Sequence, residues 1–364
     1  MSQSYEEFSA ALSDRTRRRE LLFRGDKPYF VLFSQQFSRA DLEMLSDTAT
    51  AIRRLDRHRD GVDFLRRILH GHRVMNLFAQ PSTRTAESFI AAADKLGAST
   101  RLVSDMRTSS FAKGESVDDS VRTLSSFFDT IVVRHHDDEF APRASWALSQ
   151  SGRPIPVISA GSGKSQHVTQ SLLDVYTLRY SFSNRGGIDG KRVLLVGDVG
   201  RNRAARSLAY MMTKFDVARI DIVCHKDHLP EDGLLEYLGR HGIDVRIHDR
   251  LGETLEKLGK EIDAIYMTRL QQEWDNGANG EKKLGAPDDF VLHAEYRRFL
   301  RDDCVIMHPL PRINELPEEW ESHPGFVVWR QVRNGMWMRS ALLASIHGAA
   351  DEIRARASRL GLTD

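Results

Sequence analysis

The stretch Val74-Met-Asn-Leu-Phe78, continued by Ala-Gln-Pro-Ser-Thr-Arg-Thr85, is the part of the sequence that decides the fold. Val74–Phe78 predicts a short buried strand, and Glu87–Leu96 predicts a helix. The turn Pro81–Thr85 joins them with one proline, three hydroxyl groups and one arginine. A strand that passes through a short turn into a helix is the first half of a βαβ unit.

The same alternation continues on both sides of a turn-rich break at residues 184–191. The strands expected before the break are 74–78, 130–133 and 154–158, and those after it are 192–197, 219–223, 244–247, 264–267 and 305–307. A last helix is expected from Ser340 to about Arg359. The sequence therefore predicts an α/β protein with two doubly wound domains. Each has a central parallel sheet flanked by helices, and the active site is expected in the interdomain cleft.

Composition excludes several classes of protein. The 364 residues have a formal net charge of +1, which does not fit a protein whose surface charge recruits nucleic acid. No run approaches the ~20 apolar residues that span a bilayer, and the first residues do not resemble a secretory signal. The two cysteines, Cys224 and Cys304, provide neither a disulfide framework nor a metal-ligand spacing. We expect a cytoplasmic protein without a bound metal, a membrane or a nucleic-acid partner.

The run Pro81–Thr85 has the composition of a phosphate-binding turn. Backbone N–H groups in the first turn of a helix lack partners within the helix, and the helix dipole favours an anion there. Hydroxyl groups add donors, and Arg84 can hold phosphate oxygens through two parallel bonds. The alternative is an ordinary cluster of helix-capping residues, because serine and threonine are common at this position.

Four further polar runs are found in loops of the expected sheets. The first is Ser109–Glu115, which contains Lys113, and the second is Arg134 with the two histidines after it. The third is Gly161–Gln170, which contains His167 and Gln170, and the fourth is His308-Pro-Leu-Pro-Arg312. Charged groups just beyond the carboxyl end of a parallel strand lie where α/β proteins bind ligands. The two prolines of the last run force a rigid turn that is not helical.

These five runs, in this order and at these intervals, resemble the aspartate and ornithine carbamoyltransferase family over roughly residues 35 to 350. The resemblance implies transfer of the carbamoyl group of carbamoyl phosphate to an amino acid by direct attack. It implies no cofactor and no covalent intermediate, and the departing phosphate can accept the proton of the amine. It implies an N-terminal extension at 1–27, a carbamoyl phosphate-binding domain at 28–170 plus 338–364, and an amino-acid-binding domain at 171–337. It also implies a homotrimer, or a multiple of one, with shared active sites; whether regulatory chains bind is left open.

The resemblance assigns roles to individual residues. Thr85, Arg134 and His167 would polarise the carbonyl group. The residues implied for carbamoyl phosphate are Ser82, Thr83, Arg84, Thr85, Ser109, Lys113, Arg134, His167, Gln170 and the backbone carbonyls of Pro309 and Leu310. Ser109 and Lys113 would act in the site of a neighbouring subunit. A cis peptide bond is implied between Leu310 and Pro311.

The choice of amino acid depends on a second group of residues. Arg203 would bind the α-carboxylate, and Arg269 with Gln271 would bind a side-chain carboxylate, assisted by Lys113. Leu310 is also implied as an aspartate-binding residue. An ornithine enzyme would present acidic or neutral groups to an ammonium, and would usually carry cysteine where Pro309 stands. Aspartate is therefore the expected acceptor, and the expected reaction is the second step of pyrimidine synthesis.

Four positions depart from the family pattern: Gln80, Ala86, Val168 and Arg201. Gln80 and Arg201 motivate one alternative, a carbamoyltransferase of a specialised pathway that acts on another amino acid such as a diamino acid. A second alternative is a catalytically silent paralogue with a scaffolding role. A third, a nicotinamide-dependent oxidoreductase, rests on Val193–Gly200, which has Gly-x-x-Gly and not the full dinucleotide-binding pattern.

Overall fold

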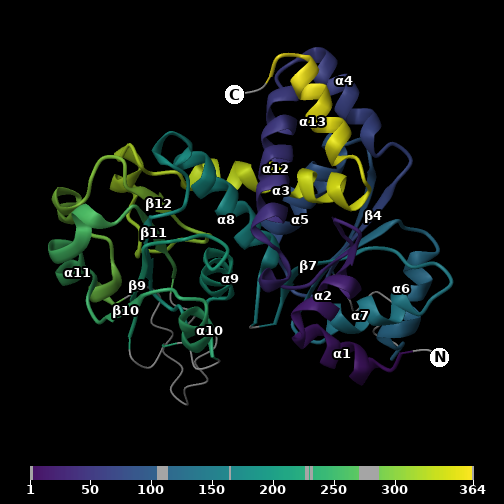
Figure 1. Cartoon of the computed structure of the whole chain (residues 1–364), viewed down its shortest axis with the longest axis horizontal. Helices are drawn as coiled ribbons and strands as arrows, with labels where there is room; N and C mark the ends of the chain where they lie inside the picture. The colour runs from purple at the N-terminus through teal and green to yellow at the C-terminus, as the bar shows by residue number, and fades with distance from the viewer. Residues whose placement is uncertain are drawn as a thin grey trace. The chain divides into compact units, whose positions relative to one another are not determined.

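The computed structural model describes residues 3–104, 114–163, 165–225, 229, 233–269 and 287–362. The chain forms two compact units (Figure 1). The first consists of residues 1–173 together with 333–364, and the second of residues 174–332. Two helices, α8 (Val168–Ser181) and α12 (Val328–Ile346), begin in one unit and end in the other. No helix in the described part of the chain is long and apolar enough to cross a membrane.

The first unit contains a parallel sheet with the strand order β3-β7-β6-β4-β5. Its elements besides α8 and α12 are α1 (Tyr5–Ser13), α2 (Arg15–Leu22), β1 (Phe23–Arg24), β2 (Lys27–Pro28), β3 (Phe30–Val31), a 3-10 turn (Ser34–Gln36), α3 (Arg39–Leu55), α4 (Arg59–Ile68), β4 (Arg73–Phe78), α5 (Thr83–Lys95), β5 (Ser99–Val103), α6 (Val117–Ser125), β6 (Thr130–His135), α7 (Phe140–Ser149), β7 (Val157–Ser162) and α13 (Ala350–Arg359). From β4 the chain passes through α5 to β5 on one side, and from β6 through α7 to β7 on the other. Right-handed crossovers in opposite directions place helices on both faces of the sheet.

The second unit repeats this plan with the strand order β10-β9-β8-β11-β12, and every pair is parallel. Its elements are a 3-10 turn (Ser183–Arg185), β8 (Arg192–Val196), α9 (Arg203–Met212), β9 (Arg219–Val223), α10 (Leu234–Arg240), β10 (Val245–His248), α11 (Leu251–Leu258), β11 (Ala264–Met267), β12 (Val305–Met307) and 3-10 turns at Gly259–Glu261, Asp288–Phe290, Ala294–Phe299 and Glu318–Ser322. Helices α9 and α11 lie on opposite sides of the strands (Figure 1). The expected fold class, two domains that each have a central parallel sheet flanked by helices, is confirmed.

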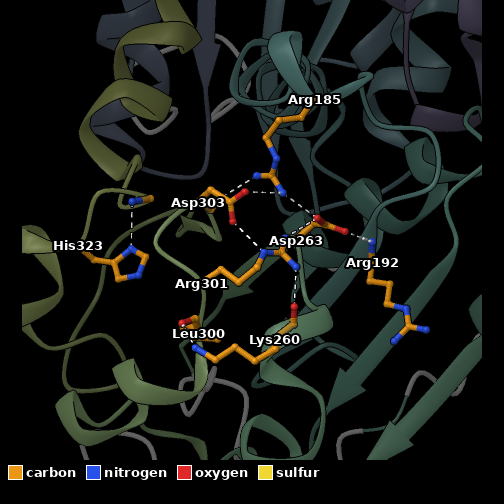
Figure 2. Close-up of polar contacts among 9 residues, drawn as sticks. Arg185, Arg192, Lys260, Asp263, Leu300, Arg301, Asp303 and His323 are labelled. Carbon is orange, nitrogen blue, oxygen red and sulfur yellow. Dashed lines mark hydrogen bonds and ion pairs between the residues drawn. The ribbon is translucent and has the colours of Figure 1, made fainter.

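A cluster of ion pairs lies at the amino ends of β8, β11 and β12 (Figure 2). The carboxylate of Asp263 accepts hydrogen bonds from Arg185 Nη2 (2.8 Å), Arg301 Nη2 (2.7 Å) and the backbone N–H of Arg192 (3.0 Å). Its side chain is 13% exposed, whereas that of Asp303, which contacts the same two arginines, is 53% exposed. Ion pairs and hydrogen bonds thus connect the amino ends of three strands. Their carboxyl ends lie at the opposite edge of the sheet.

Two expected elements differ in the structure. The helix expected from Ser340 to about Arg359 is wrong as a single element, because α12 starts earlier and ends at Ile346, and α13 follows a turn in which Gly348 has a φ of +77°. The strand expected at 154–158 is shifted to Val157–Ser162, because the prolines at 154 and 156 have no N–H to donate.

The first residues of the chain pack onto the first unit. Phe8 of α1 is completely buried, and Trp146 Nε1 donates to the backbone carbonyl of Gln3 at 2.9 Å. The ring of Tyr5 contacts the ring of Trp146 edge-on, with centroids 5.8 Å apart. Residues 3–13 therefore pack onto α7 through an aromatic contact and a side-chain hydrogen bond.

Candidate active site

The switch point of the first sheet lies between β4 and β6. The chain leaves these neighbouring strands in opposite directions, toward β5 and β7. In open α/β sheets, ligands bind outside the carboxyl ends of the strands at such a point. The turn Pro81–Thr85 follows β4, and Arg134 is near the end of β6, so two of the predicted runs meet here.

The first turn of α5 is arranged to receive an anion. Ser82 is the N-cap residue, but its hydroxyl makes no capping bond to the helix and donates instead to Thr85 Oγ1 at 3.0 Å. Thr85 is buried, Ser82 is half-buried, and Thr83 and Arg84 are exposed. The helix dipole, the hydroxyls and the guanidinium of Arg84 together favour a phosphate over an uncharged group.

Arg134 is buried at the end of β6. Its Nη1 donates to the backbone carbonyl of Ala160 on β7 at 3.1 Å, which fixes the guanidinium against the sheet. The register of β6 on β7 shifts between Val133 and His135, and such a bulge redirects the side chain it carries. The backbone N–H of Gln80 donates to the carbonyl of Arg134 at 3.2 Å, so the loop after β4 is tied to this position.

His167 and Gln170 open helix α8, beyond the end of β7. His167 is buried, and its carbonyl accepts from the N–H groups of Gln170 (3.0 Å) and Ser171 (3.2 Å). Val168, which stands where the family commonly has proline, is completely buried and is the first residue of the helix. Ser82–Thr85, Arg134, His167 and Gln170 therefore lie at or beyond the carboxyl ends of three neighbouring strands, β4, β6 and β7.

The second sheet has its switch point between β8 and β11. Arg203 is the first residue of α9, which is capped by the Asn202 side chain, and Arg269 lies two residues beyond the end of β11. Gly197 follows β8 with a φ of +109°, and a Cβ there would lie 2.2 Å from the carbonyl oxygen of Thr268. The two strand ends are therefore close, and both bring an arginine to the edge where a ligand would bind.

Arg201 makes a local contact within this turn. Its Nε donates to Asp198 Oδ2 at 2.8 Å, its backbone N–H donates to Asp198 Oδ1 at 3.2 Å, and the Asp198 side chain is completely buried. This departure from the family pattern thus supports the backbone that carries Arg203.

The run His308–Arg312 follows β12, the neighbour of β11. The Leu310–Pro311 peptide bond is cis, as expected, and Leu310 has a φ of +58°. Pro309 and Leu310 are half-buried. The backbone N–H of Leu310 donates to His308 Nδ1, and the other ring nitrogen of His308 contacts a buried glutamate, Glu315. Sequence reasoning assigned no role to His308 or Glu315; the only signal was a histidine and an acid at either end of a proline-rich turn.

Three predicted residues, Ser109, Lys113 and Gln271, lie outside the described residues. Within the described part of the chain no group of histidine, cysteine, aspartate or glutamate side chains could hold a metal ion. Cys224 and Cys304 are buried free thiols, and burial raises the pKa of each to about 12.

Two doubly wound units, each with cationic side chains at its switch point, define an α/β protein suited to anionic ligands. A family model described as the carbamoyl-P binding domain of aspartate/ornithine carbamoyltransferase matches residues 31–180, and one described as the Asp/Orn binding domain matches residues 189–346. The chain belongs to the aspartate/ornithine carbamoyltransferase family.

Relatives with known names agree with this assignment. The aspartate carbamoyltransferase catalytic subunit of Cellvibrio japonicus is 36% identical over 331 residues, which cover 89% of this chain and 93% of that protein. The chloroplastic aspartate carbamoyltransferase of Arabidopsis thaliana is 34% identical, over 86% of this chain and 76% of that protein. The structure of Trypanosoma cruzi aspartate transcarbamoylase in complex with carbamoyl phosphate and aspartate aligns with a TM-score of 0.74 and 30% identity, covering 88% of this chain and 97% of that one.

Proposed function

We propose that this protein transfers the carbamoyl group of carbamoyl phosphate to the α-amino group of L-aspartate, giving N-carbamoyl-L-aspartate and phosphate in pyrimidine synthesis. The observation that carries the proposal is the pairing of two anion-binding switch points in one chain. The first has a helix N-terminus with Ser82 and Thr85, and the second has Arg203 and Arg269. A dianionic phosphate and a dicarboxylate are the ligands that such groups select.

The donor is held by residues of the first unit. The N-terminus of α5, with Ser82, Thr83 and Arg84, binds the phosphate. Thr85, Arg134 and His167 donate to the carbonyl oxygen as it gains charge, which lowers the barrier to attack. Arg134 suits this role because its contact with Ala160 already fixes its guanidinium before substrate arrives.

The reaction is a direct displacement at the carbonyl carbon. The lone pair of the aspartate amine forms the new C–N bond, the bond from the carbonyl carbon to the phosphate oxygen breaks, and the phosphate leaves with the proton of the amine. Gln170 and the backbone carbonyls of Pro309 and Leu310 hold the carbamoyl NH2 group. Positioning and electrostatics supply the catalysis, so no nucleophilic side chain is required.

The acceptor is held by residues of the second unit. Arg203 binds the α-carboxylate, and Arg269, Gln271 and Lys113 bind the side-chain carboxylate. The diamino-acid alternative loses part of its motivation, because Arg201 is bonded to Asp198. Its charge is therefore already engaged within the turn.

An acceptor screen tests the proposal. Purified protein is given carbamoyl phosphate with aspartate, ornithine or 2,3-diaminopropionate, and phosphate release is measured. We expect release with aspartate and little with the two cationic acceptors. Arg269→Ala should lose aspartate turnover by about 100-fold or more, since the dicarboxylate loses a charge-assisted contact. Arg246→Ala, an exposed arginine of the same unit, serves as the control. Faster turnover of a diamino acid than of aspartate would refute the assignment.

We further propose a homotrimer, or a multiple of one, in which Ser109 and Lys113 complete the site of a neighbouring subunit. Mixing Arg84→Ala protein with Lys113→Ala protein should then restore activity, because some sites receive both intact residues. Mixed trimers verified by mass spectrometry that remain inactive would rule out active sites shared between subunits.

We also propose that the enzyme works in the cytoplasm, since two buried free thiols suit a reducing compartment. Cell fractionation with an antibody tests this location.

A further inference from the structure

A buried histidine–glutamate pair lies beneath the loop that follows β12. His308 and Glu315 are each 1% exposed, and His308 Nε2 is 2.8 Å from Glu315 Oε1. On the other side of the ring, the backbone N–H of Leu310 donates to His308 Nδ1 at 2.8 Å. The imidazole therefore bridges a carboxylate and the backbone of the loop.

These contacts define one tautomer of His308. Nδ1 accepts from an N–H group, so it carries no proton, and the proton of the neutral ring is on Nε2, where it donates to Glu315. Burial is the main cause that lowers the pKa of His308, and it outweighs the opposing effect of the Glu315 carboxylate. Protonation of Nδ1 would place two donors face to face at Leu310. The neutral ring is therefore the form that holds the loop.

Glu315 also holds the far end of the same loop. Its two carboxylate oxygens accept from the backbone N–H of Ile313 at 3.1 and 3.2 Å. One carboxylate thus fixes both the imidazole and the backbone three residues beyond Leu310. The left-handed conformation of Leu310, uncommon for a residue with a side chain, is held from both sides.

The base of the loop is anchored to the core of the unit. The backbone N–H of His308 donates to Gln331 Oε1 at 3.0 Å, and Gln331 Nε2 donates to Asp174 Oδ1 at 2.7 Å. Tyr266, on β11, donates its hydroxyl to Asp174 Oδ2 at 2.7 Å. The loop is therefore connected to a strand of the sheet through buried polar contacts, which restrict its movement.

We propose that His308 and Glu315 are positioning residues: Glu315 holds the neutral imidazole, and the imidazole sets the backbone of Pro309 and Leu310 so that their carbonyl oxygens receive the carbamoyl NH2 group. The inference rests on the proposed function. Neither side chain touches the reacting atoms; both act through the main chain of the loop.

Glu315→Gln is the informative change because it preserves shape. If the glutamine oxygen accepts from His308 Nε2, the amide NH2 group faces the N–H of Ile313. If the NH2 group donates to Nε2 instead, the ring proton moves to Nδ1 and faces the N–H of Leu310. In the first case the N–H of Ile313 keeps one of its two acceptor oxygens and meets a donor in place of the other; in the second case the N–H of Leu310 loses its acceptor. Both arrangements disturb the contacts that hold the loop, so we expect the carbonyl groups of residues 309 and 310 to be displaced.

His323 provides a matched control in the same unit. It is 3% exposed, and its Nδ1, seen in Figure 2, accepts from the backbone N–H of Gly325 at 3.0 Å. The donor lies two residues after the histidine, as Leu310 does after His308. Gly325 is next to the backbone of Cys304, before the start of β12, whereas His308 is beyond its end. His308→Asn and His323→Asn make the same chemical change at the two ends of one strand.

The test compares steady-state kinetics of the wild type, Glu315→Gln, His308→Asn and His323→Asn, below the unfolding temperature of each. We expect Glu315→Gln and His308→Asn to lower kcat by about 10- to 100-fold and to raise KM for carbamoyl phosphate, because misplaced carbonyls no longer orient the donor. KM for aspartate should rise less than KM for carbamoyl phosphate, because the arginines that bind its carboxylates lie outside this loop. His323→Asn should change neither kcat nor KM. Long-range ¹H–¹⁵N spectra of histidine-labelled wild type should show a ring whose proton stays on Nε2 throughout pH 6 to 8, and this signal should be absent in His308→Asn.

The outcomes distinguish the positioning role of His308 and Glu315 from the proposed function. An active wild type whose folded Glu315→Gln variant keeps wild-type kcat and KM would overturn the positioning role and leave the proposed function intact. A wild type that carbamoylates no acceptor would overturn both. If Glu315→Gln does not fold, His308→Asn decides alone, because asparagine can still accept from the N–H two residues on and loses only the carboxylate contact.

Discussion

Asp263→Asn should destabilise the second unit without impairing turnover. The carboxylate accepts two hydrogen bonds from arginines, at 2.8 and 2.7 Å, and one from a backbone N–H, with only 13% of the side chain exposed. Charge-assisted hydrogen bonds contribute roughly 1.5–3 kcal/mol each. Asparagine keeps one acceptor oxygen but loses the charge, and its NH2 group faces either the two guanidinium groups, which share Oδ1, or the backbone N–H of Arg192 at Oδ2. We expect a loss of about 2–3 kcal/mol in the free energy of local unfolding.

Native-state hydrogen exchange measures this loss where it occurs. A chain with two compact units need not unfold in one step, so a single melting temperature would average over both. Exchange of amides in β11 and β12 should accelerate by about 30- to 150-fold in Asp263→Asn, since 1.36 kcal/mol corresponds to a factor of ten. Amides of β4 and β6 in the first unit should exchange at wild-type rates.

Asp303→Asn is the matched control, since Asp303 contacts the same two arginines but its side chain is 53% exposed. We expect a loss of less than about 1 kcal/mol there, as for other exposed ion pairs. If Asp263→Asn accelerates exchange no more than Asp303→Asn, burial of the carboxylate is not what stabilises this edge of the sheet. Turnover by the folded Asp263→Asn protein should match the wild type, because the cluster is at the amino ends of the strands (Figure 2).

Three other predictions follow from single contacts. His347 is half-buried and its pKa is lowered to about 4, mainly by desolvation, so the unfolded chain binds one more proton between about pH 6.5 and 4. Stability should therefore fall by about 3 kcal/mol across that window, and His347→Gln should remove most of this fall in pH-dependent urea unfolding. Gly197→Ala should cost about 3 kcal/mol or more and abolish turnover, because its Cβ would overlap the carbonyl oxygen of Thr268; differential scanning calorimetry and the phosphate-release assay check this. Arg201→Gln should destabilise the protein by about 2 kcal/mol, through the buried Asp198, yet keep aspartate as the preferred acceptor in competition assays.

Strands of the two sheets were predictable where β-branched and other apolar residues dominate the sequence, even with charged residues such as Arg219 and Asp221 among them. Arg219–Val223 and Ala264–Met267 have the bounds expected from the sequence. The edge strand β5 (Ser99–Val103) was not expected, since it is largely exposed and its residues do not form an apolar run. The break between α12 and α13 was also missed, because the pattern of apolar residues continues across the turn at Gly348.

Part of the candidate site could be predicted from the sequence for a similar reason. Ser82, Thr85, Arg134 and Arg203 follow predicted strands directly, so a strand-by-strand reading places them at the carboxyl edge of a sheet. Glu315 could not be found in this way. It lies in a loop seven residues after His308, and only the folded loop brings the two side chains together.

The first unit is discontinuous in the sequence, and this sets the order in which the nascent protein can be completed. Residues 174–332 form an uninterrupted unit, but the first unit also needs residues 333–364. Arg354 Nη1 donates to Thr48 Oγ1 at 2.6 Å, and Arg339 Nη1 donates to Ser88 Oγ of α5 at 2.9 Å. Residues 333–364 are synthesised after residues 174–332, so the first unit can be completed only after the whole of the second unit has been made. The unit that contains β4 and α5 is thus started before the second unit and completed after it.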